Sequence, residues 1–238
     1  MKKLKNIWIY SIAIMGALLM LSTSCKKKDD NSNSNNKLTG TVADIDGNLY
    51  HTITIGTQVW MVENLKVTKY RNGDLIPIVT DNTQWGSLTT SAYCNYNNDA
   101  NNASICGRLY NWYAATDARD ISPPGWHVAS FNDFDILITY LGGDSLAGGK
   151  MRETGTVHWG TPNTTATNES GFTGLPAGCR NNSDGSFFGI GNEANWGTSS
   201  VFNTSWVWII RMYGDKKGID IDGGWDRGFG SSIRCVKD

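Results

Sequence analysis

The sequence has few charged residues and few prolines, and neither sign of charge is in clear excess. Charged side chains make up 18% of the 238 residues, with 21 basic and 22 acidic ones, and there are five prolines. Without a basic excess or a basic stripe, the chain lacks the electrostatic footprint of a nucleic-acid-binding protein. Glycine and tryptophan are abundant instead, at 27 and ten residues. This composition favours a turn-rich extracellular module of sheets over a helical bundle.

The main apolar run is too short for a membrane-spanning helix, which needs about 20 residues. It covers residues 7–21, follows three lysines near the start, and ends at the small residues 22–24. A basic start, a short apolar run and a small-residue exit are the three parts of a secretory signal peptide. We therefore expect residues 1–24 to be a signal peptide, which is removed on export.

Cys25 follows these small residues directly, and the segment 21–25 resembles the lipobox of bacterial lipoproteins. The resemblance implies cleavage before Cys25 and a lipid anchor with palmitate-type acyl chains on its sulfur. Each buried methylene of such a chain contributes about 0.8 kcal/mol, so several chains hold a protein on a membrane. Ser22 departs from the usual pattern, in which leucine is commonest at that position. The alternative is an ordinary signal peptide followed by a chance cysteine.

Residues 25–38 are polar and low in complexity. Three lysines and two aspartates follow Cys25, and residues 31–36 are only asparagine and serine. Such a tract cannot bury enough surface to fold, so we expect a flexible tether. The Lys-Asp cluster also resembles the export signal of surface lipoproteins in Bacteroidetes-type bacteria. That resemblance implies a lipid-anchored place on the outer membrane, facing the outside of the cell, whereas the alternative is simple solubility.

The remaining residues 39–238 suit a single domain. Loss of residues 1–24 leaves 18 basic and 22 acidic side chains, a net charge of about −4. Short β-branched segments bounded by glycine-rich turns predict antiparallel strands, at residues 41–43, 49–55, 58–63, 187–190, 205–213 and 231–236. The run 205–213 is apolar at successive positions, which is typical of a central strand. We expect an α+β domain with antiparallel sheets, two helices and long glycine-rich loops.

Two segments have helical periodicity. Residues 107–115 place three large side chains at i, i+3 and i+4. Residues 131–141 carry a clearer apolar stripe, which begins at Phe134 and ends at Leu141. Ser130 is placed to cap this second helix, and two glycines after Leu141 are placed to end it. The stripe is typical of a helix that packs on a core.

Four cysteines remain once Cys25 carries lipid: Cys94, Cys106, Cys179 and Cys235. An even number in an oxidising compartment favours two disulfides. Among the three possible pairings we favour Cys94–Cys106, which closes a short Asn-rich loop. The second bond, Cys179–Cys235, would then tie the end of the chain to the body. The alternative is four buried free thiols.

Several segments, taken together, carry a family resemblance: residues 55–61, 63–65, 107–112, 124–128, 170–172 with 175–176, and 232–236. As a set they resemble the Fibrobacter succinogenes major paralogous domain family. The resemblance implies a single C-type lectin-like domain, a fold shared with formylglycine-generating enzymes, in which the first and last strands pair and long loops emerge at one end. Such domains occur on secreted and surface proteins, and most have no defined activity. Residues 195–200 depart from the family pattern.

Candidate ligand-binding residues are loop tryptophans with polar neighbours. Trp196 and Trp225 lie in Gly/Asn-rich surroundings, where an indole can stack on a sugar face. Asn192 and Asp226 would supply polar contacts. The alternative role for each tryptophan is to anchor a loop to the core.

A calcium site is a weaker candidate. Asp220 and Asp222 stand at i and i+2, near Asp215 and Asp226, but no acid closes the loop at the right distance. Asp and Gly are also ordinary turn residues. The three histidines are far apart and lack zinc-ligand spacing.

No catalytic residue or cofactor is predicted, because the chain shows neither a nucleophile elbow nor a phosphate-binding loop. We interpret the protein as a lipoprotein whose domain binds or adheres to a glycan or a surface protein. One alternative is an enzyme or accessory factor acting on extracellular polysaccharide, since carboxylate pairs of glycosidases meet only in space. The other is a purely structural surface protein.

Overall fold

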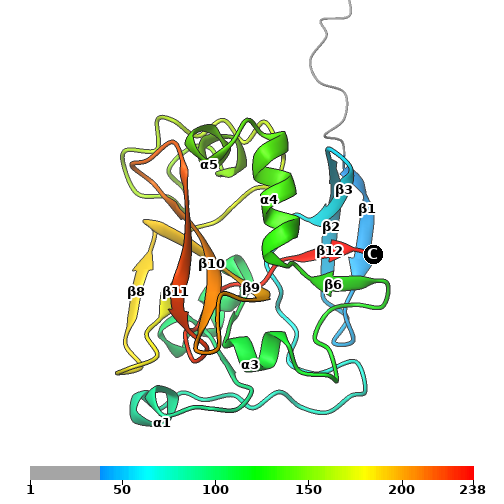
Figure 1. The fold of residues 1–238 in the computed structure, drawn as a ribbon, viewed down its shortest axis with the longest axis vertical. Coiled ribbons are helices and arrows are strands. Elements are labelled where there is room, and N and C mark those ends of the chain that lie inside the picture. The colour runs from blue at the N-terminus through cyan, green and yellow to red at the C-terminus, as the bar shows by residue number, and fades with distance from the viewer. Residues whose placement is uncertain (1–37) are drawn as a thin grey trace, which may run out of the picture. The chain divides into compact units, whose positions relative to one another are not determined.

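The first sheet brings the two ends of the domain together. In the computed structural model, β1 (Leu38–Ala43), β2 (Leu49–Ile55) and β3 (Gln58–Met61) form an antiparallel meander. The last strand, β12 (Cys235–Lys237), pairs with β3, and β6 (Trp126–Val128) pairs with the other side of β12. The strand order is therefore β1-β2-β3-β12-β6 (Figure 1).

The structure describes residues 38–238. The predicted signal peptide, Cys25 and all of the tether except Leu38 lie outside the described residues. Leu38 is the first residue of β1. Among the residues that the structure describes, no helix has the length and hydrophobicity needed to cross a membrane.

The second sheet has the order β11-β10-β9-β7-β8. Its strands are β7 (Ala177–Arg180), β8 (Phe187–Ile190), β9 (Glu193–Val201), β10 (Trp206–Tyr213) and β11 (Ile219–Asp226). β10 is antiparallel to both neighbours, while β7 runs parallel to β9. The predicted central strand is confirmed, because β10 has a partner on each side.

Shorter elements connect the sheets. A two-stranded ladder and five helices complete the described chain: β4 (Tyr93–Cys94), β5 (Leu109–Tyr110), α1 (Asn82–Gly86), α2 (Ala100–Cys106), α3 (Trp112–Ala115), α4 (Phe131–Tyr140) and α5 (Asp144–Met151), with a 3₁₀ turn at Tyr96–Asn98. The α+β class is confirmed, but the expectation of two helices is too low.

The prediction of one long helix over residues 107–115 is wrong. Gly107 has a φ of 82°, so the chain is not helical there. The next residues enter β5, and Asn111 then caps the short helix α3 through its side chain. The i, i+3, i+4 spacing of large side chains therefore came from a strand followed by a helix, both of which face the core.

Helix α4 is confirmed, together with its predicted ends. The Ser130 hydroxyl accepts from the Asp133 backbone N–H, and the Asp133 carboxylate accepts from the Ser130 N–H, which makes a capping box. Gly142 and Gly143, with φ of 100° and 88°, end the helix. Its apolar stripe is buried, as a core-packing helix requires.

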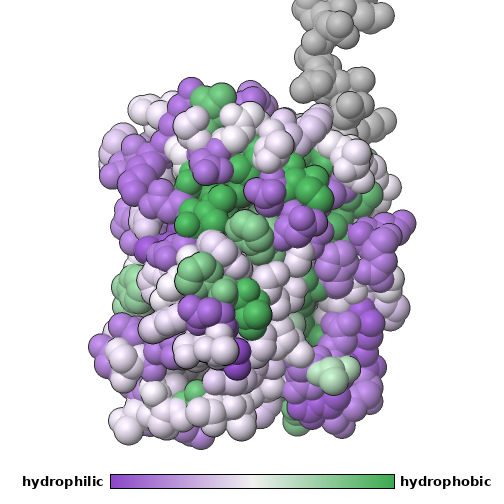
Figure 2. Space-filling view, in the orientation of Figure 1, coloured by the Kyte–Doolittle hydropathy of each residue, from purple (hydrophilic) through white to green (hydrophobic). Residues whose placement is uncertain are grey.

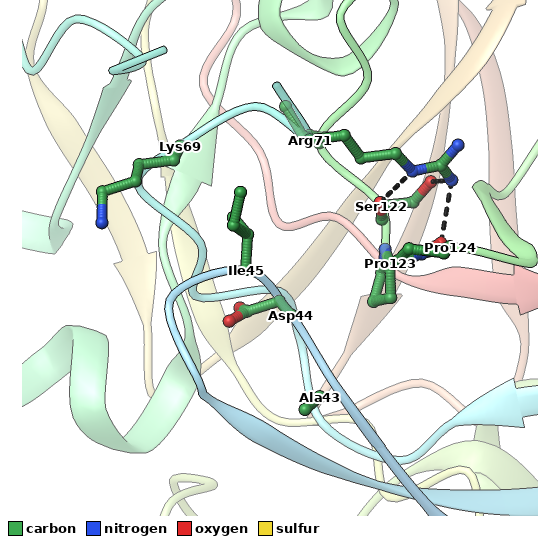
Figure 3. Close-up of a pocket in the computed structure, with 9 residues that line it drawn as sticks. Ala43, Asp44, Ile45, Lys69, Arg71, Ser122, Pro123 and Pro124 are labelled. Carbon is green, nitrogen blue, oxygen red and sulfur yellow. Dashed lines mark hydrogen bonds between the residues drawn. The ribbon is translucent and has the colours of Figure 1, made fainter. Parts of the chain in front are cut away.

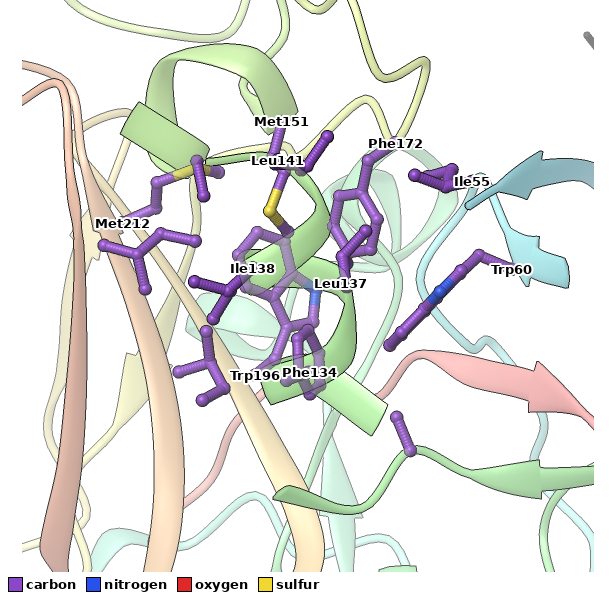
Figure 4. Packing of buried hydrophobic residues seen from close by; sticks show 14 of the residues in the cluster. Ile55, Trp60, Phe134, Leu137, Ile138, Leu141, Met151, Phe172, Trp196 and Met212 are labelled. Carbon is purple, nitrogen blue, oxygen red and sulfur yellow. The ribbon is translucent and has the colours of Figure 1, made fainter. Parts of the chain in front are cut away.

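Helix α4 fills the space between the two sheets (Figure 1). Phe134 of α4 lies 5.0 Å from the ring of Trp60, which belongs to β3 of the first sheet. Trp196 of β9 lies on the other side, with its ring 6.4 Å from Phe134 and 5.3 Å from Phe172 (Figure 4). Large aromatic rings from both sheets thus meet on one helix, and each ring buries roughly 150–250 Å².

The predicted disulfides are wrong, because all four cysteines of the described residues are buried free thiols. Cys94, Cys179 and Cys235 belong to three different hydrophobic clusters, and Cys106 ends α2. The predicted partners are therefore packed among different apolar neighbours. Burial raises the pKa of Cys94 to about 12 and that of Cys106 to about 11, so both stay protonated at neutral pH.

Candidate functional site

The four predicted ligand residues do not form one site. Glu193, next to Asn192, pairs with Tyr213 at one end of β10, whereas Asp226 pairs with Trp206 at the other end. Asn192 is exposed, and Asp226 Oδ1 accepts from the Gly228 N–H at 2.7 Å. Asn192 and Asp226 thus lie at opposite ends of the second sheet.

Trp196 is a core residue, so its prediction as a ligand contact is wrong. Its side chain is fully buried, and its indole N–H donates to Asn64 Oδ1 at 2.9 Å. Trp225, by contrast, is half-buried on the opposite face of the sheet. One face of its ring lies 4.7 Å from the Arg211 guanidinium, and Phe229 packs against it at 4.2 Å.

The calcium candidates are engaged elsewhere. Asp220 pairs with Lys216 at 3.0 Å, and Asp222 Oδ1 accepts from the Gly224 N–H at 3.1 Å. Within residues 38–238, no three His, Cys, Asp or Glu side chains converge in a way that would hold a metal ion. Asp220 and Asp222 stand at i and i+2 because they lie on the same face of strand β11.

The segments that carry the family resemblance supply a buried polar network. Arg234 is only 1% exposed, and its guanidinium donates to Asn64 Oδ1, the Met61 carbonyl and the Phe172 carbonyl at 2.8–3.0 Å. Burial lowers the pKa of Arg234, because the buried site disfavours the charged guanidinium and no carboxylate hydrogen-bonds to it. Because Asn64 also accepts from Trp196, one amide and one guanidinium join four distant segments. These residues hold the fold together and do not face a ligand.

A cleft of about 460 Å³ lies between the β1–β2 turn and the loop at residues 121–124 (Figure 3). Its polar groups are already bonded. Arg71 donates to the Ser122 and Pro123 carbonyls at 2.7 and 2.8 Å and pairs with Asp120 at 3.1 Å. Lys69 on the rim pairs with an aspartate at 3.1 Å. The cleft therefore has the volume to hold a small ligand, but few of its polar groups remain free to hydrogen-bond one.

A second cleft, of about 410 Å³, has the same character. Arg119 donates to Asp117 through its side chain and its backbone, and Ser91 donates to the same carboxylate. These hydrogen bonds, those of Arg119 foremost, hold the pKa of Asp117 well below its usual range. Both carboxylate oxygens of Asp117 accept hydrogen bonds from within the protein, so this side chain stabilises a loop.

An aromatic surface at one end of the second sheet is different, because two of its rings are exposed and two are half-buried. Trp208 of β10 stacks on Phe131 of α4 at 4.5 Å, and Phe202 meets the edge of Trp208 at 4.8 Å. Phe202 is 49% exposed and Trp206 is 41% exposed. We call Phe131, Phe202, Trp206 and Trp208 the aromatic platform. Figure 2 shows hydrophobic surface over α4 and a smaller area near the end of β9 on the same face.

The local chain geometry holds the platform in place. In the β9–β10 turn the Phe202 N–H donates to the Trp206 carbonyl at 2.8 Å, and Asn203 Oδ1 accepts from the Trp206 N–H at 3.0 Å. A Cβ on Gly223 would lie 2.5 Å from the Phe202 ring, so glycine lets that ring lie against β11. The Phe131 N–H donates to Ser200 Oγ at 3.0 Å, which fixes the start of α4 to β9.

The platform was missed in the sequence, where Trp206 and Trp208 were assigned to a central strand buried on both faces. That assignment holds for the middle of β10 and fails at its first residue, which is exposed. The polar residues just before Trp206 were the available signal, since Asn203 and Ser205 are typical of a turn that brings a strand end to the surface.

These features define an α+β domain of two five-stranded sheets joined by a helix, with an exposed aromatic surface at the end of one sheet. A family model, the Fibrobacter succinogenes major domain, matches residues 53–237, and the chain belongs to this family. The match spans every segment on which the resemblance rested. No curated protein and no solved structure matches the chain.

Proposed function

We propose that this protein is a surface lipoprotein whose non-catalytic domain binds glycans through the aromatic platform. A lipid on Cys25 would hold it on the outer membrane, and the polar tract after Cys25 would act as the spacer. The lipobox-like segment supports the anchor, and the family's occurrence on surface proteins supports the location. The domain would thereby present its binding surface to polymers outside the cell.

The exposure of Trp206 and Phe202 is the observation that carries the proposal. An aromatic face gains free energy when it covers the apolar face of a sugar ring, and an exposed cluster of large apolar side chains marks a binding surface. Asn203 is exposed beside the two rings, and Asp226 is the β11 partner of Trp206. Amide and carboxylate groups at the edge of stacked rings would bond sugar hydroxyl groups.

The proposal extends to the fold, which we propose to be a C-type lectin-like one. In support, the last strand β12 returns to pair with β3 of the N-terminal meander. β1 itself pairs only with β2, so the returning strand joins the third strand of the meander. The long connections between β3 and β6 would then correspond to the loops of that fold.

A glycan array probed with the detergent-purified protein tests the function. We expect binding to one class of glycan, and Trp206→Ala should weaken it at least about ten-fold because a stacked ring is lost. Tyr140→Ala is the matched control, since Tyr140 is an equally exposed aromatic near the far end of α4. Unchanged binding by Trp206→Ala, or no binding to any glycan, would contradict the proposal.

A further inference from the structure

Acidic side chains outnumber basic ones on the elements that form the aromatic platform. Helix α4 carries two acidic residues, β9 one and β11 three, whereas Arg211 of β10 is the single basic residue of these four elements. Arg211 faces away from the platform, because its guanidinium lies over Trp225 and donates to Glu193. The platform therefore belongs to a part of the protein with an excess of negative charge, which favours a cationic partner.

A β-bulge places Asp226 beside the exposed indole of Trp206. Between Ile209 and Val207, β10 advances by two residues while its partner β11 advances by three. The extra residue shifts the pairing, so that Trp206 stands opposite Asp226 rather than opposite Trp225. Directly opposed residues project to the same side of a sheet, with their Cβ atoms about 4.5–5.5 Å apart. The bulge thus brings a carboxylate next to the platform.

Two carboxylates beside the platform have oxygens that are free to bind a ligand. Asp226 Oδ1 accepts from the Gly228 N–H, while Oδ2 has no hydrogen-bond partner among the described residues. Asp135 is exposed, and its carboxylate makes no hydrogen bond or ion pair within residues 38–238. It lies one helical turn after Phe131, on the same side of α4. One free carboxylate therefore adjoins the platform at Trp206, and another adjoins it at Phe131.

Two cationic side chains lie close to the platform in the sequence, and both are engaged elsewhere. The Arg227 guanidinium lies 4.5 Å from the ring of Trp112, which packs on the opposite face of the sheet. His127, just before α4, contacts Asp238 at 2.7 Å and Asp133 at 3.2 Å, so two carboxylates balance its charge. Neither cation is placed to hold an acidic ligand on the platform.

We propose that the platform binds a glycan of amino sugars, whose free amino groups are protonated at neutral pH. This inference rests on the proposed function and names the class of glycan. Trp206 and Phe202 would cover the apolar faces of the sugar rings, and ammonium groups would donate to Asp226 and Asp135 and lie against the rings. A lysine side chain also carries an ammonium group, but it has no flat ring for the exposed aromatic residues to cover.

Isothermal titration of the full chain with two matched tetrasaccharides tests the inference. A glucosamine tetramer has free amino groups, whereas an N-acetylglucosamine tetramer has the same backbone and no charge. We expect the glucosamine tetramer to bind at least about five-fold more tightly, since charge-assisted hydrogen bonds are added. Asp226→Asn should remove most of this preference, and it keeps the oxygen that accepts from Gly228. Asp215→Asn is the matched control, because Asp215 is exposed in the turn at the opposite end of β10.

The outcomes separate this inference from the proposed function. If both tetramers bind equally and Trp206→Ala weakens both, the platform binds glycans without using charge, so the inference fails while the proposed function stands. Failure of the glucosamine tetramer to bind, or tighter binding of a lysine-rich peptide, also overturns the inference. If Asp226→Asn does not fold, Asp135→Asn replaces it, since that exposed side chain has no bonds to lose. A preference that stays unchanged in the variant tested overturns the assignment to these carboxylates.

Discussion

His127 joins the end of the chain to the start of α4. Its Nδ1 lies 2.7 Å from Asp238 Oδ1, and its Nε2 lies 3.2 Å from Asp133 Oδ2, in the capping box. Partial burial lowers the pKa of His127, but hydrogen bonds to the two carboxylates raise it more, so the net value is above 6.5. The geometry therefore gives this residue a structural role with two acidic partners.

The raised pKa of His127 predicts a pH-dependent stability. A cation favoured in the folded state stabilises it fully below the unfolded pKa of about 6.5, and this contribution is lost as the pH rises through the folded pKa. The side chain is 42% exposed, so the effect should stay below about 1 kcal/mol. We expect His127→Gln to lose stability at pH 5.5 but little at pH 9, by urea unfolding. A difference that does not change with pH would contradict this account.

The residues that carry the family resemblance were visible in the sequence, but their role was not. Asn64 and Arg234 are far apart in the chain, and no periodicity indicates that one bonds the other. The structure places both in the core, where a guanidinium satisfies two carbonyls and an amide oxygen. A buried cation of this kind is costly unless every donor has a partner.

Among the elements, those with strong local signals were predictable. β2, β8 and α4 were predicted almost at their observed bounds, since β-branched runs, flanking glycines and a capping box act over a few residues. β9 and β11 were missed, because β9 carries asparagine, glycine, threonine and two serines, and β11 carries three aspartates and two glycines. Those residues read locally as turns, and pairing with β10 makes them strands.

Two neighbouring glycines of β11 test how this element shapes the platform. A Cβ on Gly223 would lie 2.5 Å from the Phe202 ring, whereas a Cβ on Gly224 would have Asp222 Oδ1 as its nearest atom, at an ordinary 3.5 Å. We expect Gly223→Ala to push Phe202 out of place and weaken glycan binding about ten-fold, as for loss of one stacked ring. Gly224→Ala should bind like the native protein. Isothermal titration of both variants checks this, and equal affinities would disprove the role of Gly223.

At the scale of the whole molecule, two sheets share one helix. α4 buries its stripe between Trp60 of the first sheet and Trp196 of the second, and β12 ties the end of the chain to the N-terminal meander. Few charges are needed for such a fold, because large aromatic rings supply the contact area. The four cysteines are part of this packing, which is why an even count did not mean disulfides.

The anchor is a prediction about the whole molecule, and it concerns residues outside those described. We expect Cys25→Ala to move the protein from the membrane fraction to the soluble fraction, because the acyl chains that hold it would be missing. Fractionation followed by intact mass measures both the location and the lipid. A variant that stays in the membrane fraction and is still cut before residue 25 would contradict the lipid anchor.

The sequence by itself determined the class of the domain, its family and several elements, because these depend on local pattern or on motifs read as a set. Tertiary structure decided which aromatic residues face outward. Trp196 and Trp206 have similarly polar, turn-like neighbours, yet one is fully buried against α4 and the other is 41% exposed. Burial is set by what packs on a side chain from distant parts of the chain, and a binding surface consists of what that packing leaves uncovered.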